Sequence, residues 1–213
     1  MHHLPEPIES GLPTFPMGVL PSPERRDHQR LRTVYRVARV TTSGDQGLAK
    51  VRNLSDQGIM LSLSLPACPG APIAIELAEG CNLYGTIVWQ NGSDCGVRLG
   101  NAIDSAQTLK RLYEERYARD YRPLRLPFGK TVPITYEDGT QLVRLRDISQ
   151  SGVKIAHSGG FSPGLPVKIL LGGDLDRRGI VRWSRDGTAG IWLTENLSVA
   201  DLGSLRALSG ADF

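Results

Sequence analysis

The stretch NLSDQG at residues 53–58 recurs as DISQSG at residues 147–152, and this repetition decides the fold. The two stretches lie 147 − 53 = 94 residues apart, and the same spacing relates Trp89 to Trp183. It also relates four further pairs: Gly70 and Gly164, Pro72 and Pro166, Gly96 and Gly190, and Leu99 and Leu193. Identical residues at one fixed spacing are the signature of an internal repeat. The chain therefore contains a duplicated domain.

Each copy has the pattern of short β-strands. Residues 73–77 alternate between core-facing and outward-facing side chains, and residues 58–63 form another apolar strand segment. Hairpin turns are expected at Asn91-Gly92 in the first copy and at Asp186-Gly187 in the second. Several short strands joined by glycine-rich turns favour a small β-barrel. An all-β-dominated chain with two tandem antiparallel barrels is therefore predicted.

A change of hydrophobic period after each copy predicts a helix there. Between residues 104 and 119, apolar residues recur at steps of three and four, which is typical of an amphipathic helix, and Asp104 is the expected N-cap. A shorter closing helix with Ser198 as its N-cap is expected in the second copy. Trp89 and Trp183 are expected to be buried inside their barrels, with a base-stacking surface as the alternative.

Composition limits the classes of function. The net charge of +3 excludes a general polyanion binder, so an electrostatic function requires local clustering of charge. The three cysteines form no C-x-x-C pair, and the four histidines lack the spacing of metal ligands. No apolar stretch approaches a membrane span, so a soluble, cytoplasmic protein is expected. Because no nucleophile elbow or phosphate-binding loop is present, we expect no enzyme, no cofactor and no metal site.

Arginines crowd the segment that enters the first copy: Arg25, Arg26, Arg30, Arg32, Arg36 and Arg39. Lysine is absent from this segment, although it would serve equally well for a diffuse positive field. Arginine instead offers a planar fork that pairs with phosphate through two hydrogen bonds and stacks on bases. The use of arginine rather than lysine favours geometrically specific recognition of an anion. The alternative interpretation is a solvated basic segment without a ligand.

Arg26-x-x-x-Arg30, followed by Asn53-x-Ser55-x-x-Gly58 in a short β domain, resembles the PilZ family. The signature of that family is R-x-x-x-R followed by D/N-x-S-x-x-G on a six-stranded β-barrel, and its known ligand is cyclic di-GMP. The resemblance implies two tandem six-stranded antiparallel barrels, each followed by a C-terminal α-helix. It also implies that the arginines grip the phosphates and guanines, while the polar turn contacts the ligand from the barrel. The ligand-binding residues implied in the first barrel are Arg25, Arg26, Arg30, Asn53, Ser55 and Gly58.

The second copy departs from this signature. It carries the full turn motif, but its nearest arginines are three apart, and R-x-x-x-R spacing would require an arginine at Tyr121. Either a weaker ligand site or a scaffold for a partner is compatible with this, and the sequence favours the scaffold. The second-domain candidates are Arg122, Arg125, Asp147, Ser149 and Gly152.

The sequence thus predicts a flexible N-terminal tail at 1–23, a first barrel with a linker helix at 24–118, and a second, degenerate barrel with a closing helix at 119–213. The function expected is a cytoplasmic cyclic di-GMP receptor or adaptor. In this hypothesis the ligand orders the arginine segment, from Arg25 to Arg36, and thereby signals to an unidentified protein effector. A ligand-free interaction adaptor is the alternative. The modest charge and scarce lysine weigh against nucleic acid as a partner.

Overall fold

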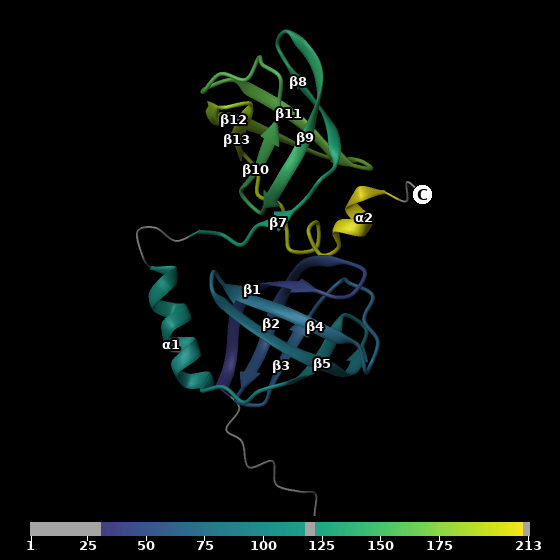
Figure 1. Cartoon of the computed structure of the whole chain (residues 1–213), viewed down its shortest axis with the longest axis vertical. Helices are drawn as coiled ribbons and strands as arrows, with labels where there is room; N and C mark the ends of the chain where they lie inside the picture. Colours follow the sequence, from purple (N-terminus) through teal and green to yellow (C-terminus); the bar gives the residue numbers. More distant parts are fainter. Residues whose placement is uncertain (1–30, 118–121, 211–213) are drawn as a thin grey trace, which may run out of the picture.

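The computed structural model describes residues 31–117 and 122–210, so the expected tail at 1–23 lies outside the described residues. Two β-barrels follow one another along the long axis of the molecule, the first drawn purple to blue and the second green (Figure 1). Each closes six antiparallel strands, and each is followed by a short helix. The predicted fold class is therefore confirmed.

The first barrel has the strand order β1-β2-β3-β6-β5-β4, closed by pairing of β1 with β4. Alternating side chains of its strands fill the interior, as in β4, where Ile73, Ile75 and Leu77 are buried. Its strands are β1 (Leu31–Thr41), β2 (Gln46–Ser55), β3 (Gly58–Ser62), β4 (Pro72–Ala78), β5 (Cys81–Asn91) and β6 (Asp94–Leu99).

The second barrel repeats this arrangement with one difference at its entrance. The counterpart of β1 is divided into a two-residue strand, β7 (Leu126–Pro127), and β8 (Thr131–Tyr136), and both pair with β9 (Gly139–Ser149). Pairing of β9 with β10 closes the six longer strands, and β7 lies beside β9 as an addition. The remaining strands are β10 (Gly152–Ala156), β11 (Pro166–Gly172), β12 (Leu175–Arg185) and β13 (Thr188–Leu193).

The two predicted hairpin turns form, but they differ in type. Arg185 pairs with Thr188, so the turn is Asp186-Gly187, and both residues have positive φ (50° and 68°), as a type I′ turn requires. In the first barrel Asn91 pairs with Asp94, so the central residues are Gly92 and Ser93 rather than Asn91 and Gly92. Only Gly92 has positive φ, which is typical of a type II′ turn.

The helix after the first barrel, α1 (Ser105–Arg116), begins where it was predicted, because Asp104 accepts a hydrogen bond from the backbone N–H of Gln107 at 2.8 Å. The closing helix, α2 (Leu205–Ser209), begins later than expected. Ser204 is its N-cap, whereas Ser198 and Asp201 exchange backbone-to-side-chain hydrogen bonds in a preceding turn. No helix within the described ranges is long and apolar enough to cross a membrane.

The two barrels touch through the β1–β2 hairpin and the segment that leads into α2. Leu48 of the first barrel is buried in the core of the second, and its N–H donates to the Leu202 carbonyl at 2.8 Å. A Cβ on Gly47 would lie 2.1 Å from the Gly203 carbonyl oxygen, so only glycine permits this approach. Asp45 accepts hydrogen bonds from the Ser204 hydroxyl and the Arg206 N–H. The hairpin thereby caps a helix that belongs to the other domain.

Candidate functional site

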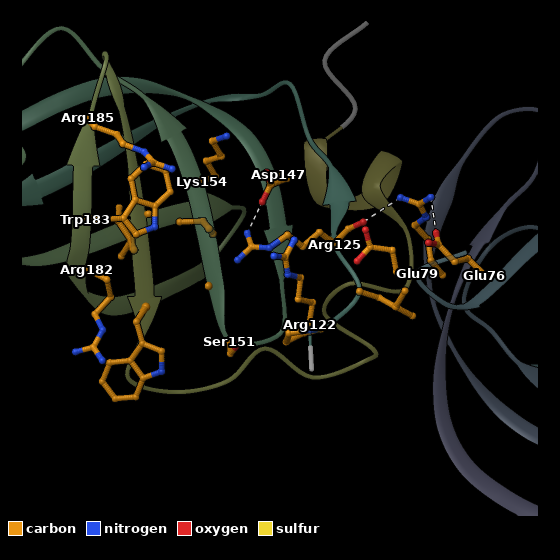
Figure 2. A pocket seen from close by; sticks show the side chains of 18 residues that line it. Glu76, Glu79, Arg122, Arg125, Asp147, Ser151, Lys154, Arg182, Trp183 and Arg185 are labelled. Atoms are coloured by element: carbon orange, nitrogen blue, oxygen red, sulfur yellow. Dashed lines mark hydrogen bonds and ion pairs between the residues drawn. The ribbon is translucent and has the colours of Figure 1, made fainter. Parts of the chain in front are cut away.

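A cleft of about 850 Å³ opens where the second barrel faces the first (Figure 2). The second barrel supplies most of its walls, and the first barrel contributes Arg39, Glu76 and Glu79. The positively charged side chains that the second barrel places there are Arg122, Arg125, Lys154, Arg182 and Arg185. This clustering supplies the local positive charge that the net charge of the whole chain does not reveal.

The turn motif of the second barrel, residues 147–152, lines this cleft with Asp147, Ser151 and Gly152. β7 pairs with the end of β9, with Pro127 opposite Asp147, which brings the preceding Arg125 beside that carboxylate. The Arg125 guanidinium donates a hydrogen bond to Asp147 Oδ1 and forms an ion pair with it. Its side chain is still 48% exposed, so further donors of the guanidinium are open to a ligand. The ion pair fixes the orientation of one planar donor fork at the cleft wall.

Strand pairing gives the counterpart of Arg125 in the first barrel. Leu31 pairs with Leu54 and Leu126 pairs with Ile148, so at the barrel entrance the spacing between copies is 126 − 31 = 95 rather than 94. At a spacing of 95, Arg125 corresponds to Arg30. The second copy therefore retains one arginine of the R-x-x-x-R motif, and Arg122 adds another guanidinium to the same cleft.

The serine and glycine of the motif build the hairpin in both copies. The hydroxyl of Ser55 donates to the Gly58 carbonyl at 3.1 Å, and Ser149 donates to Gly152 at 3.0 Å. Neither glycine has positive φ. A Cβ on Gly152 would lie 2.7 Å from the Ile191 carbonyl oxygen, so glycine lets β10 approach β13 closely. Gly152 lines the cleft, whereas the Ser149 side chain is fully buried.

Aromatic and cationic side chains alternate along one wall of the cleft. The Lys154 ammonium lies 5.9 Å from the ring centre of Trp183, and the Arg185 guanidinium lies 5.4 Å from it. Arg182 lies 5.8 Å from the ring centre of Trp192. These distances are those of cation–π contacts, so the rings help to hold the positive charges in place.

The expectation that Trp89 and Trp183 are buried is wrong, since they are 41% and 37% exposed. Each indole lies across a glycine of the adjacent strand. A Cβ on Gly96 would be 2.1 Å from Trp89 Nε1, and one on Gly190 would be 2.2 Å from Trp183 Nε1. Because glycine has no side chain, one edge of the indole packs directly on it, and the rest of the indole stays at the surface. Trp183 therefore presents aromatic surface to the cleft.

The arginine segment before the first barrel is described only in part. Arg25, Arg26 and Arg30 lie outside the described residues, but backbone pairing places Arg32 opposite Asn53. The first residues of β1 therefore lie beside the turn motif. From Leu31 onward the segment belongs to β1, which pairs with β2 on both sides of an irregularity between Arg32 and Arg36.

Two of the arginines serve the fold. Arg36 donates to the Leu77 carbonyl at 2.8 Å and to the Leu112 carbonyl at 2.6 Å, which ties α1 to the first barrel. Arg39 forms an ion pair with Glu76 at 2.5 Å and donates to the Arg125 carbonyl at 3.1 Å, across the two barrels. Arg39 thus links the first barrel to the loop that carries the second-barrel arginines.

The corresponding surface of the first barrel carries less charge. Asn53 stands where the second barrel has Asp147, and its Oδ1 is shielded from solvent without a hydrogen bond from the described residues. At the spacing of 94, the first-barrel counterparts of Lys154, Arg182 and Arg185 are Met60, Val88 and Asn91. Sequence analysis missed these three cations, although a position-by-position comparison of the copies shows the gain of charge. It also missed Arg39 and Glu79 as parts of the cleft, because they come from the other domain.

A model of the family described as PilZ domain matches residues 24–115 and again residues 116–210. The chain belongs to the PilZ family. The resemblance noted from the two motifs is thereby confirmed for both copies, and the chain is a tandem PilZ protein.

Similar solved structures include the PlzA protein of Borreliella burgdorferi in complex with c-di-GMP, 9% identical over 80% of this PilZ chain and 88% of that one, with a TM-score of 0.31. The inhibitor of motility of Bacillus subtilis is 10% identical over 83% of this chain and 94% of that one, with a TM-score of 0.30. YcgR from Escherichia coli, in complex with c-di-GMP, is 13% identical over 78% and 77%, with a TM-score of 0.28. No curated protein matches the chain.

Proposed function

We propose that this tandem PilZ protein is a receptor for cyclic di-GMP that acts as an adaptor without catalytic output. The observation that carries the proposal is the cleft in which the ion-paired Arg125 and Asp147, the cations on β10 and β12 and the exposed ring of Trp183 converge. Cyclic di-GMP, the known ligand of the family, combines two phosphates with two guanines. The cleft offers a suitable group for each part of that molecule.

The phosphates and the bases of cyclic di-GMP each have a counterpart among the residues of the cleft. Guanidinium forks pair with phosphate oxygens through two hydrogen bonds, and Arg122 and Arg125 both face the cleft. A purine stacks on an exposed aromatic ring, which Trp183 provides. A volume of about 850 Å³ lies in the range of small-molecule sites. An anion with flat, polar bases therefore fits better than an inorganic anion, which would leave the aromatic wall unused.

The first barrel provides a second binding site for cyclic di-GMP in this proposal. Arg25, Arg26 and Arg30 would contact the ligand there together with Asn53, Ser55 and Gly58. The pairing of Arg32 with Asn53 supports this, because it places the start of β1, which directly follows Arg30 in the sequence, at the turn motif. Ligand binding would order the residues before β1 and change the surface offered to a protein effector in the cytoplasm.

Titration calorimetry of the full chain with cyclic di-GMP tests the proposal. Arg125→Ala is expected to weaken binding to the cleft about 10- to 100-fold, since a hydrogen bond to a charged group contributes about 1.5–3 kcal/mol. Arg178→Ala is the matched control, because Arg178 is exposed on β12 and does not line the cleft. Arg26→Ala with Arg30→Ala tests the first barrel, and loss of part of the stoichiometry is expected. Absence of heat with the wild-type chain would refute the proposal.

A ligand-free interaction adaptor remains the second candidate function. It is favoured by one observation: Arg36 and Arg39 each form hydrogen bonds or ion pairs with other residues of the protein itself. The same calorimetry separates the two functions. An adaptor of this kind would bind a protein partner with equal affinity in the presence and absence of cyclic di-GMP.

A further inference from the structure

Glu79 reaches the cleft from the first barrel, although the cleft belongs mainly to the second. It lies in the two-residue turn between β4 and β5, where Ala78 pairs with Cys81 and Gly80 has a φ of 76°. The Glu79 side chain is exposed at the cleft wall and points away from the first barrel toward the side on which Arg125 lies (Figure 2). Its carboxylate forms no hydrogen bond or ion pair within the described ranges.

The strand that leads into this turn is linked to the second barrel through Arg39. At the end of β4, Glu76 forms an ion pair with Arg39 at 2.5 Å, and Arg39 donates to the carbonyl of Arg125 at 3.1 Å. The end of β4, three residues before Glu79, is therefore linked to the loop that carries the arginines of the second barrel. Glu79 lines the same cleft as those cations without an ion pair to one of them.

Charge balance sets Glu79 apart from the other acids of the cleft. Asp147 is paired with Arg125 and Glu76 is paired with Arg39, whereas Glu79 has no such partner among the described residues. An unpaired carboxylate repels phosphate, so a site for a simple anion would be weakened by it. The same carboxylate is favourable if it faces a part of the ligand that only donates hydrogen bonds.

We propose that Glu79 reads the Watson–Crick edge of one guanine and thereby selects cyclic di-GMP over cyclic di-AMP; this inference rests on the proposed function. A carboxylate accepts only, and the guanine edge offers it two donors, N1–H and the N2 amino group. The adenine edge places the lone pair of N1 there instead, which the carboxylate repels. The first barrel thus supplies base selectivity to the site, while the second barrel holds the phosphates.

Titration calorimetry with cyclic di-GMP and with cyclic di-AMP tests the role of Glu79. In Glu79→Ala, the ratio of the two affinities is expected to fall about tenfold, in line with the discrimination that one bidentate contact to a base provides. Glu79→Gln retains one acceptor oxygen and is expected to give an intermediate ratio. Because Glu79 is exposed, these variants are expected to keep the thermal unfolding temperature of the wild type.

Asp174→Ala is the matched control, because Asp174 is an exposed acid in the equivalent turn of the second barrel and does not line the cleft. It is expected to leave the affinity ratio unchanged. If wild type binds cyclic di-GMP but Glu79→Ala keeps the wild-type ratio, the role of Glu79 is refuted and the receptor function stands. If wild type binds neither dinucleotide, both proposals fail. An equal fall of the ratio in Asp174→Ala would also overturn the inference.

Discussion

Replacement of Asp45 by alanine is expected to loosen the contact between the two barrels. Asp45 accepts hydrogen bonds from the Ser204 hydroxyl and from the Arg206 N–H at 3.0 Å, both on the far side of the domain boundary. A hydrogen bond to a charged group contributes about 1.5–3 kcal/mol, and partial exposure places each of these near the lower limit. Asp45→Ala should therefore cost about 3 kcal/mol in the unfolding free energy of the second barrel.

Differential scanning calorimetry of the full chain measures this cost. For a domain the size of the second barrel, about 3 kcal/mol corresponds to a fall of about 12–24 °C in the unfolding temperature. The transition of the second barrel should separate from that of the first, because α2 loses its cap from the neighbouring domain. Asp138→Ala is the control, since Asp138 is exposed in the equivalent hairpin turn of the second barrel. Equal unfolding temperatures for the two variants would refute the reasoning.

Three further predictions concern single side chains. Arg36→Ala removes the hydrogen bonds to the Leu77 carbonyl of β4 and the Leu112 carbonyl of α1 and should lower the unfolding free energy by about 2–3 kcal/mol, measured by urea denaturation. Gly190→Ala places a methyl group 2.2 Å from Trp183 Nε1, so the ring must move and cyclic di-GMP affinity should fall severalfold in calorimetry. Burial raises the pKa of the Cys95 thiol from 9.0 to about 11. Because the unfolded thiol loses its proton first, stability should decline as pH rises from 9 to 11, and Cys95→Ala should reduce that decline in urea midpoints taken across this range.

The repeated motif and the alternation of apolar residues were sufficient to predict the two barrels. Both depend on local rules, since strand period and turn residues such as Asp186-Gly187 act within a few positions. The same holds for Asp104, whose side chain caps the helix that follows it by accepting from the N–H three residues ahead. Ser198 shows the limit of such rules. It has the residue type of a cap, but it exchanges hydrogen bonds with Asp201 in a turn, and the helix begins at Leu205 with Ser204 as its cap.

The cleft depends on contacts between residues far apart in the chain, which explains why the sequence did not reveal it. Arg39 and Arg125 are 86 residues apart and meet only because the two barrels pack together. The exposure of Trp183 depends on Gly190 in the neighbouring strand, and alternation along one strand carries no information about that partner. The sequence indicated which residue types recognise a nucleotide, but the position of one domain against the other decides which of them share a site.

Two of the three tryptophans of the chain, Trp183 and Trp192, line the cleft, and the third, Trp89, belongs to the first barrel. The protein therefore carries intrinsic fluorophores where we place the dinucleotide. A guanine stacked on an indole quenches its emission, so occupancy can be followed in the unlabelled chain by excitation near the red edge of the protein absorption band. With Trp89→Phe, the remaining emission comes from the cleft alone, and a stopped-flow instrument can then separate loading of the second barrel from loading of the first.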